Sequence, residues 1–435
     1  MSVIAPKFRL SYLIKGITDN IFWIIVLVTL LGIPAIQIVL IYIDFPVIDG
    51  EIWNPFRVFD AMTHPERALP LVKNFMQTDL FKIVAFPGFG FAALIAAGTI
   101  FVERKLLAKL QLRVGPFYCG KVEGILQLMS DGLKLISKEI IIPAKADKPL
   151  FWAAPVLFAA TAAAFVALIP VAPGMVIADI DLGLLAVFAV IGFFPIITIV
   201  SAWSANSKFP FIGGIRALYQ MVSFEIPLIL SLLGIVMLTG TLSLVGIVES
   251  QANFPWIIFM PIGAIVFFIC ILAELERIPF DLPEAESEIV AGWLTEFSGM
   301  MYGLVQLGSY LKLYAFAALF VVLFLGGWNG PWFYPMEPIA EVITDGVVLM
   351  PGALTLEIEG GLLFSQEMIN GLIWFVLKTV GVILVILIPR GVFPRIRIDL
   401  LLQIGWYKLI MLAFVNIFIA LALVYSGIIG PGGIL

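Results

Sequence analysis

Acidic residues gather in one short segment of the chain, at positions 274–296. The segment holds seven carboxylates and a single arginine: Glu274, Glu276, Arg277, Asp281, Glu284, Glu286, Glu288 and Glu296. Strongly hydrophobic stretches lie on both sides of it. Carboxylates at a membrane boundary are costly unless they pair with a cation or share protons, so they often belong to a proton path or an ion site. The plainer alternative is a solvated loop between two membrane helices.

The composition excludes several kinds of chemistry for this chain alone. Of its 435 residues, 62% are hydrophobic and 13% are charged, which is about half the charged fraction of a soluble domain. Cys119, Cys270 and His64 are the only cysteines and histidine. An iron–sulfur cluster takes about four cysteine ligands, and no glycine-rich phosphate loop is present. We expect no metal site, no resident cofactor and no nucleic-acid partner, so any redox cofactor would belong to partner subunits.

Hydrophobic runs of about 20 residues are long enough to cross a bilayer as helices. Seven uncharged runs and two that contain one lysine each meet this length: Ile21–Ile43, Ile83–Val102, Leu150–Val171, Leu182–Trp203, Ile226–Val248, Phe254–Ala273, Phe297–Val322, Met368–Pro389 and Leu409–Ile428. The sequence therefore predicts an all-α, polytopic bundle of about nine transmembrane helices. Apolar residues at helical spacing over 122–140 add an amphipathic helix at the membrane interface.

The basic residues predict the orientation of this bundle. With the N-terminus inside, 19 of the 25 Lys and Arg residues fall in inner segments and four in outer ones. Such a bias places the N-terminus in the cytoplasm. Segments 103–149, 274–296 and 390–408 should then share the cytoplasmic face.

Three inner segments carry the residues that could do chemistry, and together they resemble a known family. The first contains Glu103-Arg104-Lys105, Gln111 to Pro116 and Asp131-Gly132-Leu133-Lys134; the second contains Gly213-Gly214-Ile215-Arg216 and Ser223-Phe224-Glu225; the third is the acidic segment, with Arg-Ile-Pro-Phe-Asp-Leu-Pro-Glu-Ala-Glu at 277–286. These strings, with Pro394 to Asp399 and Gly405-Trp406, resemble the membrane subunit of respiratory complex I that joins its peripheral and membrane arms. The resemblance runs from about residue 83 to 428. It implies a domain over 83–435, preceded over 1–82 by an extra helix and an outer loop.

The resemblance also implies a function in a quinone-reducing, proton-pumping complex. The chain would form much of the tunnel for a lipid quinone, and the iron–sulfur clusters and flavin would lie in partner subunits of the peripheral arm. Proton-relay candidates are Glu225, Glu274, Glu284, Glu286, Glu288 and Glu296. Tunnel candidates are Arg104, Arg113, Asp131, Phe224 and Arg277, while Asp281 and Arg216 would organise the loops by ion pairing. Read without the resemblance, Arg104 is an ordinary positive-inside anchor and Phe224 a packing residue.

The chain departs from the family pattern at three places. The helix Ile21–Ile43 is additional, Lys312 stands where an uncharged residue is expected, and Tyr407 separates Trp406 from Lys408. None of these lies in the acidic segment. Two alternatives stay open: the homologous subunit of a ferredoxin-linked or deazaflavin-linked complex or membrane-bound hydrogenase, and a stand-alone ion transporter. The main expectation is a multi-pass subunit in the plasma (inner) membrane of a prokaryote, in contact with membrane lipids and membrane-arm subunits; an organellar membrane is also compatible.

Overall fold

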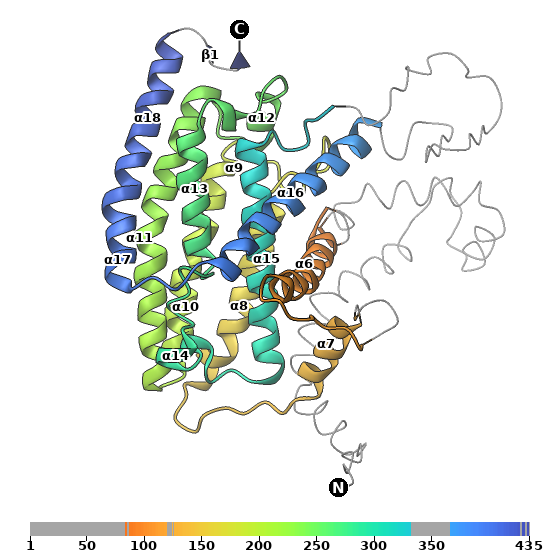
Figure 1. Cartoon of the computed structure of the whole chain (residues 1–435), viewed down its shortest axis with the longest axis vertical. Coiled ribbons are helices and arrows are strands. Elements are labelled where there is room, and N and C mark those ends of the chain that lie inside the picture. The colour runs from red at the N-terminus through yellow and green to blue at the C-terminus, as the bar shows by residue number, and fades with distance from the viewer. Residues whose placement is uncertain are drawn as a thin grey trace, which may run out of the picture.

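The computed structural model of the chain describes residues 83–84, 87–119, 124, 126–331 and 366–426, together with two short strands near the C-terminus. Within this part the fold is a bundle of long helices (Figure 1). The longer ones are α6 (Phe89–Leu110), α8 (Lys148–Ala167), α10 (Phe193–Ser204), α11 (Lys208–Thr239), α13 (Pro261–Glu274), α15 (Gly299–Phe324), α16 (Gln366–Val392) and α18 (Ile410–Tyr425). The predicted all-α class is confirmed, since the only described strands, β1 (Ile429–Gly430) and β2 (Gly433–Ile434), form one short antiparallel pair.

Helix α15 lies at the centre of the bundle. It packs against α8, α16 and α6, and almost its whole length is buried. Aromatic side chains fill these contacts, with Phe316 of α15 edge-on to Phe165 of α8 at 5.0 Å between ring centroids. A helix that is apolar on all sides is stable in water only when neighbours cover it, or in a membrane. The central position of α15 follows from this property.

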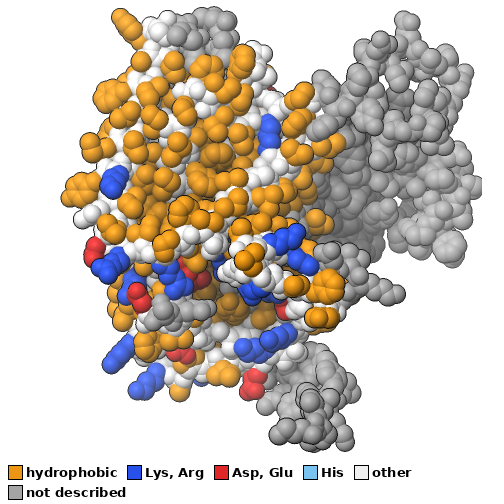
Figure 2. Space-filling model, viewed as in Figure 1, with side chains coloured by type: hydrophobic (Ala, Val, Ile, Leu, Met, Phe, Trp, Pro, Cys, Tyr) orange, Lys and Arg blue, Asp and Glu red, His pale blue; other side chains and the backbone are white. Residues whose placement is uncertain are grey.

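Six described helical segments are long and apolar enough to cross a membrane. Figure 2 shows that apolar side chains cover most of the visible flank of the bundle, whereas charged side chains gather towards the end that carries α7 (Gln127–Ser137) and α14 (Glu286–Ile289). Helix α7 corresponds to the predicted amphipathic helix and has no fully buried residue. The expected helix Ile21–Ile43 and the division at residue 82 lie outside the described residues.

The predicted span Ile226–Val248 has different bounds in the structure. Helix α11 begins at Lys208 and ends at Thr239, where Gly240 adopts a left-handed conformation, as glycine commonly does after a helix. A separate short helix, α12 (Leu244–Glu249), follows. The predicted start of this helix was too late. The hydropathy criterion began the span after the charged residues Arg216 and Glu225, but charged residues do not interrupt a helical backbone. Glu225, which directly precedes the predicted span, lies in the middle of α11.

Other predicted spans agree with the structure or are shifted. Span 182–203 agrees with the continuous helical stretch Gly183–Ser204, in which Gly192, itself in a helical conformation, separates α9 (Gly183–Ile191) from α10. Span 254–273 begins with the short 3₁₀ helix η1 (Trp256–Ile258), so that α13 starts only at Pro261. Helix α6 continues through the charged residues Glu103, Arg104 and Lys105.

The last span begins earlier than predicted and contains an unusual turn. Helix α17 (Ile398–Gln403) leads into the π-helical segment η3 (Ile404–Leu409), which leads into α18. A π segment fits one extra residue into a helix without changing its direction. Tyr407, which the sequence singled out between Trp406 and Lys408, lies in η3.

Candidate functional site: a buried charge network at the charged end of the bundle

Glycines allow the acidic segment to fold against the end of α11. A Cβ atom on Gly213 of α11 would approach the Cα atom of Gly292 to 2.7 Å, so the two backbones meet where neither has a side chain. Gly292 opens the 3₁₀ helix η2 (Gly292–Leu294) with a positive φ of 55°, a conformation that favours glycine. Gln220 of α11 fixes the other side of the segment by donating to the carbonyl oxygens of Ala273 and Phe280 at 2.7 and 2.8 Å.

Arg277 binds a carboxylate outside its own segment. Its Nη1 lies 2.5 Å from Oε1 of Glu103, which is almost fully buried on α6, and its guanidinium lies 5.1 Å from the ring centroid of Tyr310 on α15. Arg390, in the last turn of α16, binds the same oxygen of Glu103. The ion pairs of the Glu103 carboxylate therefore link α6 to α16 and to the acidic segment.

Asp281 and Glu288 bind basic residues that the sequence places far away. Asp281 Oδ2 is 3.0 Å from Nη2 of Arg395, and the nearby Ile396 amide donates to the Pro279 carbonyl at 3.2 Å. Glu288 Oε2 is 2.5 Å from Nη1 of Arg216 on α11. The ion-pairing roles expected of Asp281 and Arg216 agree with these contacts, and segments 103–149, 274–296 and 390–408 meet at one end of the bundle.

A second group of carboxylates lies deeper, around Lys312 of α15. The Lys312 ammonium donates to the backbone oxygen of Glu274 at 2.6 Å and lies 3.4 Å from its Oε2. Both side chains are nearly inaccessible, at 3% and 1% exposure. Lys312 also interacts electrostatically with Glu225 of α11 and with Glu276. Its Nζ lies 4.3 Å from the ring centroid of Phe194.

Glu276 lies just beyond the end of α13, at the boundary between the two groups. Its Oε2 accepts a hydrogen bond from Trp293 Nε1 at 3.4 Å. Burial raises the pKa of the Glu276 carboxyl from its ordinary value of 4.5 to about 7, while the Lys312 charge acts in the opposite direction. Removal of a carboxylate from water disfavours its ionised form. Glu276 is thus able to gain and lose a proton near neutral pH.

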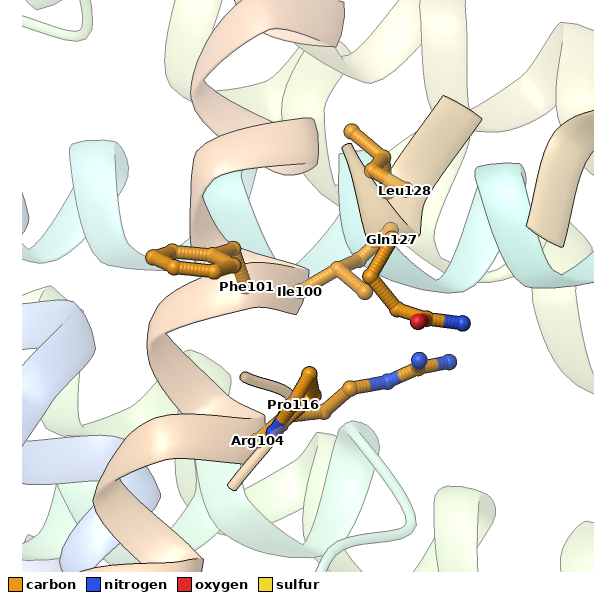
Figure 3. A pocket seen from close by; sticks show the side chains of 6 residues that line it. All are labelled: Ile100, Phe101, Arg104, Pro116, Gln127 and Leu128. Carbon is orange, nitrogen blue, oxygen red and sulfur yellow. The ribbon is translucent and has the colours of Figure 1, made fainter. Parts of the chain in front are cut away.

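A small open pocket lies where α6 meets α7. Its walls are Ile100, Phe101, Arg104, Pro116, Gln127 and Leu128. In Figure 3 the polar ends of Arg104 and Gln127 lie on the same side of the pocket. Both residues bind Asp131, through Arg104 Nη1 at 2.5 Å and Gln127 Nε2 at 2.9 Å. The expected tunnel residues Arg104 and Asp131 are therefore neighbours.

The remaining sequence candidates have less distinct positions. Phe224 is fully buried and packs against Phe280 at 5.3 Å between ring centroids, which agrees with the packing interpretation. Arg113 is exposed and donates to Gln111 at 2.8 Å. Glu284 and Glu296 are half-buried. The side chain of Glu286 lies outside the described residues.

Comparison with known proteins identifies the family. Residues 83–421 match the family described as NADH dehydrogenase. The chain is 41% identical over 343 residues to the H subunit of NADH-quinone oxidoreductase from Geobacillus sp. (strain WCH70), covering 78% of this chain and 93% of that protein. It is 40% identical over 340 residues to the H subunit of the same enzyme from Bacillus thuringiensis (strain Al Hakam), covering 78% and 90%. The chain belongs to this family.

As a member of this family, the chain is a multi-pass membrane subunit of an oxidoreductase complex and is not catalytic alone. The resemblance drawn from the sequence motifs is confirmed. Residues 1–82 precede the matched region.

The structure adds Glu103, Glu276 and Lys312 to the site residues expected from sequence. Glu103 was part of a recognised string but was given no role, and Lys312 was noted only as a departure from the family. The sequence signal that could have identified Glu103 and Lys312 is an ionisable residue within or beside a hydrophobic run, because such a residue commonly marks a functional position.

Proposed function

We propose that this chain forms the quinone tunnel and the first part of the proton path of a proton-pumping NADH-quinone oxidoreductase. The observation that carries the proposal is the arrangement of Glu276, Glu274 and Glu225 around Lys312, next to the acidic segment. Buried ionisable groups are costly in a membrane and are kept where protons or ions move. The relatives, which are named as H subunits of NADH-quinone oxidoreductase, support NADH and a quinone as the substrates of the whole complex.

The pocket between α6 and α7 supports the quinone part of the proposal. Ile100, Phe101 and Leu128 offer an apolar wall, and Arg104 and Gln127 offer hydrogen-bond donors. A lipid quinone needs both, because its tail and ring are apolar and its two carbonyl oxygens accept hydrogen bonds. The pocket has room for about one water molecule, so partner subunits would have to supply almost all of the tunnel. The exposed Met129 and Leu133 of α7 are available to such a partner or to lipid.

The carboxylates support the proton part. Reduction of a quinone to a quinol consumes two electrons and two protons, and the electrons would come from an iron–sulfur cluster in a peripheral-arm subunit. Exposure falls from Glu288, through the half-buried Glu276, to the buried Glu274. Glu284, Glu286 and Glu296 belong to the same segment as the outer members of this path. A charge that forms during quinone reduction would change the proton affinity of the nearest carboxylates, and coupled carboxylates would pass the change inward.

The proposed setting is the plasma membrane of a prokaryote, with the charged end of the bundle in the cytoplasm. This end would contact the peripheral-arm subunits, while the apolar flank would contact lipids and membrane-arm subunits. The excess of basic residues in the segments at this end favours this orientation.

The experiment uses the whole complex in liposomes, with Glu225→Gln compared against Glu249→Gln. Glu249 is an exposed carboxylate on α12, at the other end of the bundle (Figure 1). Turnover is measured with NADH and a short-chain quinone, and pumping with a pH-sensitive dye. Glu225→Gln should lower pumping about tenfold or more because an amide cannot carry the proton, whereas Glu249→Gln should not change it. Normal pumping by assembled Glu225→Gln complex would contradict the proposed path.

A further inference from the structure

Lys312 is the residue of the buried network that the family pattern does not account for. It lies in the middle of α15, the most enclosed helix among the described residues, and its side chain is 3% exposed. A lysine that is deprived of water must be compensated by partners, or it loses its charge. The partners of Lys312 show what its charge does in this structure.

The groups that interact with Lys312 belong to several neighbouring elements. Helix α13 contributes Glu274, helix α11 contributes Glu225, and the segment after α13 contributes Glu276. Helix α10 contributes the ring of Phe194 at 4.3 Å, and α15 itself contributes Phe316 at 5.8 Å. Cys270, one turn before Glu274 on α13, interacts electrostatically with Glu274. Lys312 thus contacts Glu274 directly and interacts at longer range with Glu225 and Glu276, which are half-buried.

The hydrogen bonds of Glu274 are incomplete. Oε2 faces Lys312, while Oε1 is buried and has no hydrogen-bond partner among the described residues. A buried acceptor without a partner is costly, and a proton on this oxygen or a water molecule beside it would remove the cost. A single ammonium group can balance the charge of only one of the three carboxylates at a time.

We propose that Lys312 is the fixed counter-charge of the proton path: it stabilises one ionised carboxylate at a time among Glu225, Glu274 and Glu276. When one of these carboxyls releases its proton, the O–H bond breaks there, an O–H bond forms on a neighbouring carboxylate, and the negative charge moves the other way. Lys312 takes no part in the proton transfer itself, and no electrons move. Lys312 is a positioning residue in this scheme, and the inference rests on the proposed proton path.

The test uses the whole complex in liposomes and the variants Lys312→Met, Lys312→Arg and Lys378→Met. Lys378 is the matched control, because it is the other lysine within a predicted span but donates to the carbonyls of Leu325, Gly327 and Asn329 instead of a carboxylate. Lys312→Met should lower coupled turnover about tenfold and move the pH profile of the residual activity to higher pH by about one unit. Lys312→Arg should restore most of the turnover, because it restores the charge. Lys378→Met should leave the pH profile unchanged.

A double variant separates this role from a purely structural ion pair. Lys312→Met with Glu274→Gln removes both charges, so it should recover thermal stability lost in the single variant, while pumping stays low. Wild-type pumping and an unshifted pH profile in the double variant would overturn the proposal. It would also fall if Glu225→Gln abolished pumping while Lys312→Met did not. If Glu225→Gln itself left pumping normal, the proposed path would be refuted, and the role of Lys312 in that path would be refuted with it.

Discussion

Glu103 shows how much a single buried carboxylate can organise. It binds Arg277 from the acidic segment and Arg390 from the end of α16. The three residues belong to parts of the chain that are far apart in sequence, and no local pattern marks them as partners. Their contact fixes the position of the acidic segment against α6.

We expect Glu103→Gln to destabilise the complex more than any change to an exposed acid. The variant leaves the buried Arg277 without its counter-ion, and breaking a buried pair in this way costs about 3 kcal/mol or more. The melting temperature of the purified complex measures the effect. Glu139→Gln, at an exposed position, is the control and should leave it unchanged. Equal melting temperatures for both variants would contradict the role given to Glu103.

Glu276 predicts a pH dependence of stability. Its pKa in the folded protein is raised from 4.5 to about 7 by burial, so the folded state holds a proton that the unfolded state releases. Its contribution to stability is therefore fully present below pH 4.5 and is lost as the pH rises through 7. Glu276→Gln should flatten the fall of melting temperature between about pH 5 and pH 8, a window that follows from these two pKa values. An unchanged slope would show that other groups cause the fall.

At the scale of whole helices, hydropathy located the helices better than it located their ends. The central stretches of α8, α15 and α16 agree with the predicted spans, because a long apolar run has few alternatives to a buried helix. The bounds of α11 and α13 differ from those of the predicted spans. The ends of a helix are determined by capping and packing, and not by the position of the first charged residue. For this reason Glu225, which directly precedes the predicted span, is found in the middle of α11.

The π-helical segment η3 predicts different tolerance to two single-residue deletions. Deletion of Tyr407 should convert η3 into a regular α-helical turn and leave α18 in register, so complex yield should stay within about twofold of wild type. Deletion of Leu412 from α18 should turn all later residues by about 100°. That rotation would move Asn416 away from the Ser231 carbonyl, to which it donates at 3.0 Å. Yield from gentle detergent purification compares the two, and equal losses would contradict this account of η3.

At the scale of the molecule, the bundle has one charged end and an apolar flank. The acidic segment, helix α7 and segment 390–408 all belong to the charged end (Figure 2). The basic residues of these segments favour the cytoplasm. The two ends of the bundle should therefore be reachable from opposite sides of the membrane.

Cysteine labelling of intact cells or sealed vesicles tests this orientation. In a chain with Cys119→Ser, a cysteine at Glu139 should react only with reagent on the cytoplasmic side, and one at Glu249 only with reagent outside. Both positions are exposed, and Cys270 is buried. A detergent-solubilised sample, in which both should react, is the control. Reaction of both positions from the same side of sealed membranes would refute the assigned topology.

The sequence by itself determined the class of fold and the family, and it predicted which segments carry the candidate site residues. These conclusions follow from hydropathy, charge distribution and ordered motifs. All three are properties of residues that are close in sequence, so they can be recognised before the packing of the helices is known. Only the tertiary structure decided which charges meet. Arg277 was expected to line the tunnel, and the structure shows that it binds Glu103, 174 positions away. Lys312 was only an unexplained departure until packing brought it to Glu274. Such pairs depend on how the helices are packed and rotated against each other, and this is fixed by contacts between distant segments.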